Sequence, residues 1–264
     1  MKKLLSLILV MAFALCLLVS CGGDKGNDGQ TPPAGDTNTP ADKETDKNPP
    51  VEEPYVDPNA KSEGVMTYAE YDAAAMDAEV VIEAYVQAHQ SWWDNKITVY
   101  AQDPDGAYFI YEMACSEEDA AKLVPGTKIR VTGYKGTWAG EIEIMDATFE
   151  IVTDGTWIAE ATDVTALLGT EELIKHQNKF VCFKGLTIEE ISYKNGEPGD
   201  DIYVTVSLNG ASYDFCVERY LTDPDTDVYK AFAELKAGDK VDIEGFLYWY
   251  EGVNTHITSV KTAG

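Results

Sequence analysis

Hydrophobic positions divide the chain into three parts. A nearly continuous apolar run covers residues 4–19, whereas residues 22–63 contain almost no aliphatic side chains. From residue 66 onward, short segments alternate between apolar and polar positions, which is the period of half-buried β-strands. The pattern predicts an N-terminal hydrophobic segment, a polar linker and a β-rich folded part.

The β-rich part contains an internal repeat. Residues 123–134 and 235–246 share the spacing L-x-x-G-x-K-[IV]-x-[IV]-x-G-[YF], and its last glycine is Gly133 in one copy and Gly245 in the other. We consider this spacing too specific for coincidence. The repeat predicts two related domains, with the two glycines at equivalent positions of a strand.

Both copies show the same order of elements before the repeat: an apolar strand, a polar loop, a hairpin and a short helix. The hairpins are predicted over residues 97–111 and 202–217, with Asp-Gly at 105–106 and Asn-Gly at 209–210. These dipeptides are the usual turn residues of tight hairpins. Each copy then ends in a strand pair.

Helix starts are predicted from side chains that can accept backbone hydrogen bonds. Ser116 is expected to cap a helix over residues 117–123, and either Asp225 or Asp227 is expected to cap a helix over 228–235. Both helices are short and leave the fold predominantly β.

The order strand, strand, strand, helix, strand, strand is that of the OB-fold, a five-stranded barrel. We therefore predict an all-β protein of two tandem five-stranded OB-fold (Greek-key) barrels, each with one short helix, after a disordered tether. The expected boundaries are 1–21 for a lipoprotein signal peptide, 22–65 for a flexible acidic tether, 66–155 for the first barrel and 156–264 for the second.

The N-terminus carries an export pattern. Lys2 and Lys3 precede the apolar run, which ends at Ser20 just before Cys21. The run Leu-Val-Ser-Cys at 18–21 resembles the lipobox of bacterial lipoproteins, in which the cysteine receives a lipid. This resemblance implies an extracytoplasmic protein attached to the membrane through Cys21. A retained membrane-spanning helix is the alternative, although the run is short for it.

Several segments of both copies are similar to OB-fold lipoproteins of Gram-positive bacteria. They are residues 66–71, 90–96 and 107–111 in the first copy, and 163–168 and 183–187 in the second. The resemblance implies a fold and a location, and little about activity.

The formal net charge of −26 changes the expectation about partners. Both folded halves are acidic, and nucleic-acid binding depends on Lys and Arg that neutralise phosphates. We expect a non-enzymatic binding or envelope module with a glycan or protein ligand and consider nucleic acid unlikely. Two alternatives stay open, a single-stranded nucleic-acid-binding OB module and an accessory module of a surface hydrolase.

Aromatic residues are the best candidates for ligand binding. Adjacent strand residues face opposite sides, so Trp92 and Trp93 cannot both lie inside a barrel. OB-folds bind ligands on strands 2 and 3, between the loops that join strands 1–2 and 4–5. Trp92, Trp93, Trp138 and Tyr108 fall in these places. The alternative is that the rings cover the barrel ends and hold the two copies together.

No motif indicates a catalytic, metal or cofactor site, and we expect none of the three. Asp223, Asp225 and Asp227 match the first ligand positions of a calcium loop, but Val228 stands where that loop needs a glycine.

The cysteines after residue 21 are odd in number and show no disulfide framework. They are Cys115, Cys182 and Cys216.

Overall fold

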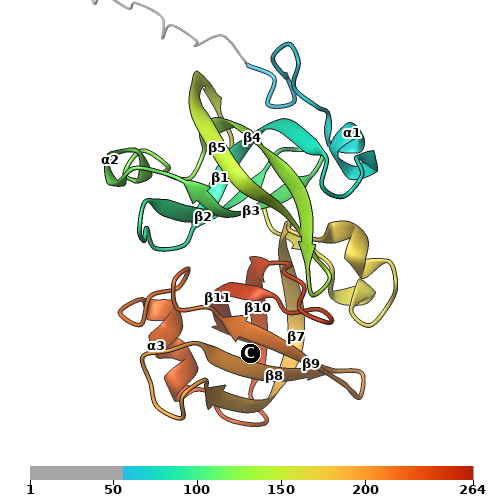
Figure 1. The fold of residues 1–264 in the computed structure, drawn as a ribbon. Coiled ribbons are helices and arrows are strands. Elements are labelled where there is room, and N and C mark those ends of the chain that lie inside the picture. Colours follow the sequence, from blue (N-terminus) through green and yellow to red (C-terminus); the bar gives the residue numbers. More distant parts are fainter. Residues whose placement is uncertain (1–55, 264) are drawn as a thin grey trace, which may run out of the picture. The chain divides into compact units, whose positions relative to one another are not determined.

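The computed structural model describes residues 56–263, which form two β-barrels (Figure 1). The predicted all-β fold of two OB-fold barrels is confirmed. The predicted domain boundaries stay a prediction. Signal peptide, Cys21 and tether residues 22–55 lie outside the described residues.

The first barrel closes in the order β1-β2-β3-β5-β4, because β4 also pairs with β1. All neighbours are antiparallel except β3 and β5, which are parallel. Two helices accompany it, α1 (Tyr68–Ala73) and α2 (Glu117–Ala120). The strands are β1 (Glu79–His89), β2 (Lys96–Gln102), β3 (Ala107–Ala114), β4 (Thr127–Trp138) and β5 (Glu141–Thr156).

The second barrel repeats this topology in the order β7-β8-β9-β11-β10, with β10 returning to β7. The short strand β6 (Thr162–Asp163) adds to β7 in parallel. Helices η1 (Thr165–Leu167) and η2 (Leu173–His176) precede β7, and α3 (Asp227–Glu234) precedes β10. The strands are β7 (Phe180–Tyr193), β8 (Ile202–Leu208), β9 (Ala211–Val217), β10 (Lys240–Phe246) and β11 (His256–Thr262).

The repeat glycines occupy equivalent positions, as predicted. Gly133 on β4 pairs with β1, and Gly245 on β10 pairs with β7. A Cβ on Gly133 would lie 2.7 Å from a side-chain carbon of Ile144, and one on Gly245 would lie 2.2 Å from the backbone oxygen of His256. Close approach of the last strand explains why both copies have glycine here.

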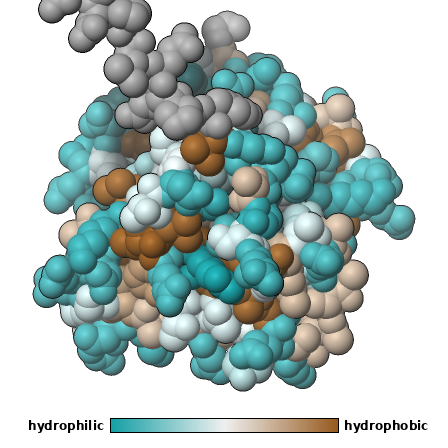
Figure 2. All heavy atoms as spheres, turned by 90° about the horizontal axis from the view of Figure 1, so that it is seen from above, coloured by the Kyte–Doolittle hydropathy of each residue, from teal (hydrophilic) through white to brown (hydrophobic). Residues whose placement is uncertain are grey.

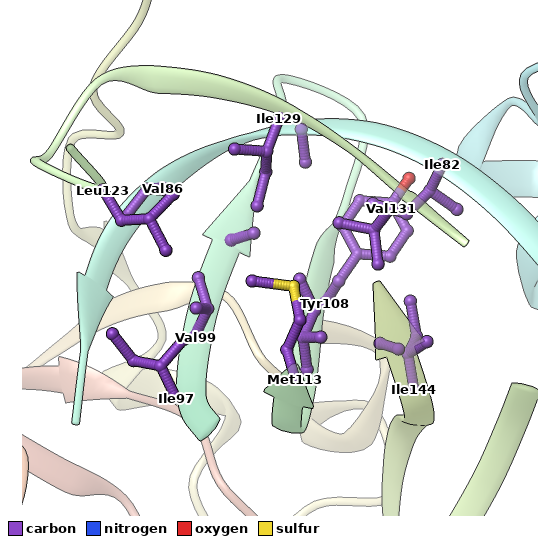
Figure 3. Close-up of a cluster of buried hydrophobic side chains, with 14 of the residues drawn as sticks. Ile82, Val86, Ile97, Val99, Tyr108, Met113, Leu123, Ile129, Val131 and Ile144 are labelled. Atoms are coloured by element: carbon purple, nitrogen blue, oxygen red, sulfur yellow. The ribbon is translucent and has the colours of Figure 1, made fainter. Parts of the chain in front are cut away.

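Each barrel has its own apolar core. In the first, alternate residues of the strands point inward, and Tyr108 and Met113 fill the centre together with aliphatic side chains (Figure 3). In the second, Phe183, Phe215 and Phe232 are fully buried. On the face in Figure 2, hydrophilic residues surround separate hydrophobic patches.

The predicted helix cap is confirmed in the first barrel and is wrong in the second. The Ser116 hydroxyl accepts the Asp119 N–H and starts α2, as predicted. The predicted cap Asp225 or Asp227 is wrong, because Thr226 between them accepts the Tyr229 N–H. Thr, like Asp, has a side-chain oxygen that suits this position.

The end of the predicted tether is held against the first barrel. Lys61 Nζ lies 2.7 Å from the buried Asp103 carboxylate and donates to the Glu83 carbonyl oxygen. Lys128 Nζ, 3.3 Å from the Glu83 carboxylate, also donates to the Ala60 carbonyl oxygen. These contacts attach Ala60 and Lys61, which fall within the predicted tether, to buried acidic residues of the first barrel.

Among residues 56–263, no helix is long and apolar enough to cross a membrane. Cys115, Cys182 and Cys216 are buried free thiols.

Candidate functional site

A groove of about 560 Å³ lies on the outer side of β2 and β3, beside the loop that joins β1 to β2. We call it the β2–β3 groove. In OB-folds this is the side that binds ligands. Its lining residues are Gln90, Ser91, Trp93, Lys96, Ile97, Thr98, Tyr111, Glu112, Arg219 and Tyr220.

A tight turn presents Trp93 to solvent. The backbones of Trp93 and Lys96 exchange two hydrogen bonds of 3.0 and 2.9 Å. Between them, Asp94 and Asn95 have φ values of 47° and 61°, a left-handed conformation that Asp and Asn tolerate better than most residues. The side chain of Trp93 is 79% exposed and therefore offers an open ring face.

The strand surface adds a second ring and an ion pair. Tyr111 on β3 is 43% exposed. Lys96 Nζ lies 2.6 Å from a Glu112 carboxylate oxygen, and the Tyr111 hydroxyl donates to the other oxygen at 3.1 Å. The hydrogen bond from Lys96 lowers the pKa of Glu112, and the same contact raises the pKa of Lys96. Both groups are therefore charged at neutral pH.

The second barrel contributes the remaining wall. Ser91 N–H donates to the Tyr220 carbonyl oxygen at 2.7 Å, which joins the β1–β2 loop to the segment after β9. The Arg219 guanidinium lies 5.1 Å from the centre of the Tyr220 ring, and that ring is 54% exposed. Groove formation thus requires residues of both barrels.

The rest of the β2–β3 face is covered. Tyr100 and Phe109 point away from the first core and are buried against Phe246 and Tyr248 of the second barrel. The Tyr100 hydroxyl shares a 2.6 Å hydrogen bond with Nδ1 of His256, whose pKa burial lowers to about 3. This imidazole is neutral, and the second barrel buries this half of the face.

The four predicted ligand-binding aromatics lie in four different environments. Trp93 lines the groove. Trp92 is half-buried against the first core, where its indole N–H donates to the Cys115 carbonyl oxygen at 2.9 Å. Tyr108 is fully buried in that core (Figure 3), and its hydroxyl donates to Asp103. Trp138 is 63% exposed at the end of β4 but does not line the groove.

The prediction that Tyr108 binds a ligand is therefore wrong. It is a core residue, because strand alternation turns it inward while its neighbour Phe109 faces outward. The sequence analysis did not name Tyr111, although residues two apart on a strand face the same side and Tyr111 therefore lies on the outer face with Phe109. Arg219 and Tyr220 carry no such signal, since only the packing of the second barrel brings them to the groove.

Within the described part of the chain, no group of three or more His, Cys, Asp or Glu residues is placed to hold a metal ion.

No protein-family model matches the chain, and no curated protein matches it. Solved structures that match include a murine DNA-binding protein bound to double-stranded DNA, at 12% identity and a TM-score of 0.34, covering 70% of this chain and 100% of that one. A second is the Ifi202 HINa domain in complex with a 20-bp double-stranded DNA, at 11% identity and a TM-score of 0.33, covering 70% of this chain and 100% of that one. A third is p202 HIN1 in complex with a 12-mer double-stranded DNA, at 11% identity and a TM-score of 0.32, covering 79% of this chain and 100% of that one.

DNA is the partner named with these structures, whereas the sequence led us to expect a glycan or protein ligand and to consider nucleic acid unlikely. We do not retain that expectation. The net charge of −26 belongs to the whole sequence, whereas the groove is lined by two cations, Lys96 and Arg219, and one carboxylate, Glu112. TM-scores of 0.32 to 0.34 carry no argument for what this chain binds, which must come from its own residues.

Proposed function

We propose that the chain binds single-stranded nucleic acid in the β2–β3 groove, without a catalytic step. One observation carries the proposal: three exposed rings, Trp93, Tyr111 and Tyr220, line a single groove together with the cations of Lys96 and Arg219. Non-specific single-strand binding combines these two elements, aromatic faces for bases and positive charge for the backbone.

Stacking supplies most of the affinity in this proposal. Each base stacked on an aromatic ring contributes about 1–3 kcal/mol, and unpaired bases expose the faces that stacking needs. A duplex keeps its bases stacked on one another, so the rings favour a single strand.

Charge supplies a smaller part of the binding affinity. Lys96 is paired with Glu112, whereas Arg219 forms no salt bridge among residues 56–263. One or two phosphate contacts predict a slope of about −0.7 to −1.4 in a plot of log affinity against log salt. Affinity should therefore fall only about three- to sevenfold between about 50 and 200 mM salt.

The test is a fluorescence-anisotropy titration of the full chain with labelled oligothymidylate at both salt concentrations. Trp93→Ala and Tyr220→Ala should each weaken binding about 5- to 150-fold, the equivalent of one stacked ring. Trp138→Ala is the matched control, since this indole is also exposed but lies outside the groove. A neutral glycan panel is titrated alongside.

Absence of oligothymidylate binding at both salt concentrations would refute the proposal. Equal losses in Trp138→Ala and Trp93→Ala would also refute it, because the groove would then have no special role.

The location is proposed on sequence grounds alone. The Leu-Val-Ser-Cys run at residues 18–21 supports export and lipid attachment at Cys21, which would place the groove outside the cytoplasmic membrane. Membership of the OB-fold lipoproteins of Gram-positive bacteria is part of the same proposal.

A further inference from the structure

The turn after β9 is the part of the second barrel that forms a wall of the β2–β3 groove. Arg219 and Tyr220 of this turn line the groove, and the Tyr220 carbonyl oxygen accepts the Ser91 N–H of the β1–β2 loop at 2.7 Å. The turn thus carries a cation and an exposed ring on which the proposed function rests. Groups that fix the conformation of this turn also fix part of the groove.

Two carboxylates hold three successive backbone N–H groups of the turn. Glu218 Oε1 accepts the Tyr220 N–H at 3.1 Å, and Glu218 Oε2 accepts the Leu221 N–H at 2.8 Å. Asp201, just before β8, accepts the Arg219 N–H at 3.1 Å. Hydrogen bonds to an ionised acceptor are stronger than those to a neutral one, so the stability of the turn depends on the charge of these carboxylates.

Glu218 is a carboxyl group whose charge changes near neutral pH. Its side chain is partly buried, and this burial raises its pKa to about 7, with a further rise from the negative charge of Asp201. Asp201 is 8% exposed and pairs with Lys194, whose Nζ lies 2.8 Å from its carboxylate. The positive charge of Lys194 opposes the rise in the pKa of Glu218 without cancelling it.

Other titratable groups lie around the two carboxylates. Burial raises the pKa of the Tyr100 hydroxyl on β2 and of the Cys216 thiol on β9, and it lowers the pKa of His256 on β11 to about 3. The hydrogen bond to Asp201 raises the pKa of Lys194, which stays charged. These four groups therefore keep their charge state near neutral pH and do not mask a change at Glu218.

We propose that Glu218 is a positioning residue of the β2–β3 groove and makes ligand binding dependent on pH. In its ionised form the side chain accepts two N–H groups and holds Arg219 and Tyr220 in the groove wall. A proton on one carboxyl oxygen turns that oxygen into a donor, so the turn loses one of its hydrogen bonds.

The inference rests on the proposed binding of single-stranded nucleic acid and adds that the strand selects the ionised form of Glu218. Binding then releases a proton wherever Glu218 is protonated in the free protein.

The first test is a fluorescence-anisotropy titration of the full chain with oligothymidylate at constant salt. We expect the wild-type affinity to fall about five- to tenfold from about pH 8 to about pH 6, because a charged acceptor of the turn becomes neutral. Glu218→Gln mimics the protonated carboxyl group, with one acceptor oxygen and one donor. It should bind at both pH values as weakly as the wild type does at the lower one.

Glu141→Gln is the matched control. It removes another buried carboxyl group with a raised pKa, and this group lies outside the groove. The variant should keep the pH profile of wild-type binding. Thermal melts at each pH confirm that both variants are folded.

The second test is NMR of the ¹⁵N-labelled protein without a ligand. The backbone N–H signals of Tyr220 and Leu221 should titrate with a midpoint near pH 7 in the wild type and should not titrate in Glu218→Gln. Asp201→Asn removes the charge that contributes to the raised pKa of Glu218, so the midpoint should move to lower pH.

The two tests separate this inference from the proposed function. Absence of oligothymidylate binding at every pH would refute the proposed function and the link to a ligand, whereas the NMR titration would still show whether Glu218 controls the turn. Where binding is observed, wild-type affinity of Glu218→Gln at about pH 8 would overturn the positioning role. An affinity that rises as the pH falls would also overturn it, because the carboxylate would then act by repelling phosphates. Tyr220 and Leu221 signals that do not titrate, or a midpoint that Asp201→Asn leaves in place, would assign the pH dependence to another group.

Discussion

Glu141→Gln should remove a large part of the pH dependence of stability. Glu141 is fully buried, and desolvation raises the pKa of its carboxyl group from 4.5 to about 8. In the unfolded chain this group loses its proton near pH 4.5, whereas the folded chain keeps the proton up to about pH 8. The free energy of unfolding therefore falls as pH rises through this window, and above it the contribution of Glu141 is constant.

The size of the effect follows from the two pKa values. A difference between 4.5 and about 8 corresponds to about 5 kcal/mol, because one pKa unit is worth about 1.4 kcal/mol. Glutamine keeps an oxygen for the Trp249 and Gln177 donors and cannot ionise. The stability of the variant relative to the wild type should thus increase by a few kcal/mol between about pH 5 and pH 9.

Urea denaturation of both proteins across this pH range measures the difference. Some pH dependence will remain in the variant, since burial also raises the pKa of Glu218, to about 7. Parallel pH profiles of the two proteins would refute the reasoning, because Glu141 would then titrate alike in the folded and unfolded chains.

Three further changes test the fold and the N-terminal segment. Gly245→Ala should destabilise the protein by about 1–3 kcal/mol in urea denaturation, because its Cβ would meet the backbone of β11, whereas Gly252→Ala, with nothing within 4 Å, should not. Lys61→Met should cost about 3–5 kcal/mol in the same assay, since it leaves buried Asp103 without its cation; an unchanged midpoint would show that the contact is not formed. Cys21→Ala should abolish lipid attachment in a bacterial host, and mass spectrometry that finds an unmodified Cys21 in the wild type would contradict the anchor.

The sequence predicted the barrels because their determinants are local. The Asn-Gly turn at Asn209-Gly210 adopts the positive φ values of 55° and 83° that a tight hairpin requires. The repeat glycines, Gly133 and Gly245, sit where one strand approaches another too closely for a side chain. Turn chemistry and strand alternation are readable from neighbouring residues, which is why the strand order was predictable.

The site depends on how the barrels pack, and the sequence contains little information about that. Tyr100 and Tyr111 both project from the outer β2–β3 face, yet the second barrel buries the first and leaves the other exposed. Arg219 follows a strand of the other barrel and reaches the groove only through this contact. The cap at Thr226 was missed for a simpler reason, since Asp225, Thr226 and Asp227 are all good capping residues.

The most direct test of nucleic-acid binding is to observe the indole N–H signals during a titration. The full chain, labelled with ¹⁵N, is titrated with oligothymidylate of about ten nucleotides, and Trp93→Phe assigns the signal of the exposed indole. We predict a saturable shift of the Trp93 signal, while that of Trp92, bonded to the Cys115 carbonyl oxygen, stays in place. An unmoved Trp93 signal at saturating oligonucleotide would contradict a ligand site in the groove.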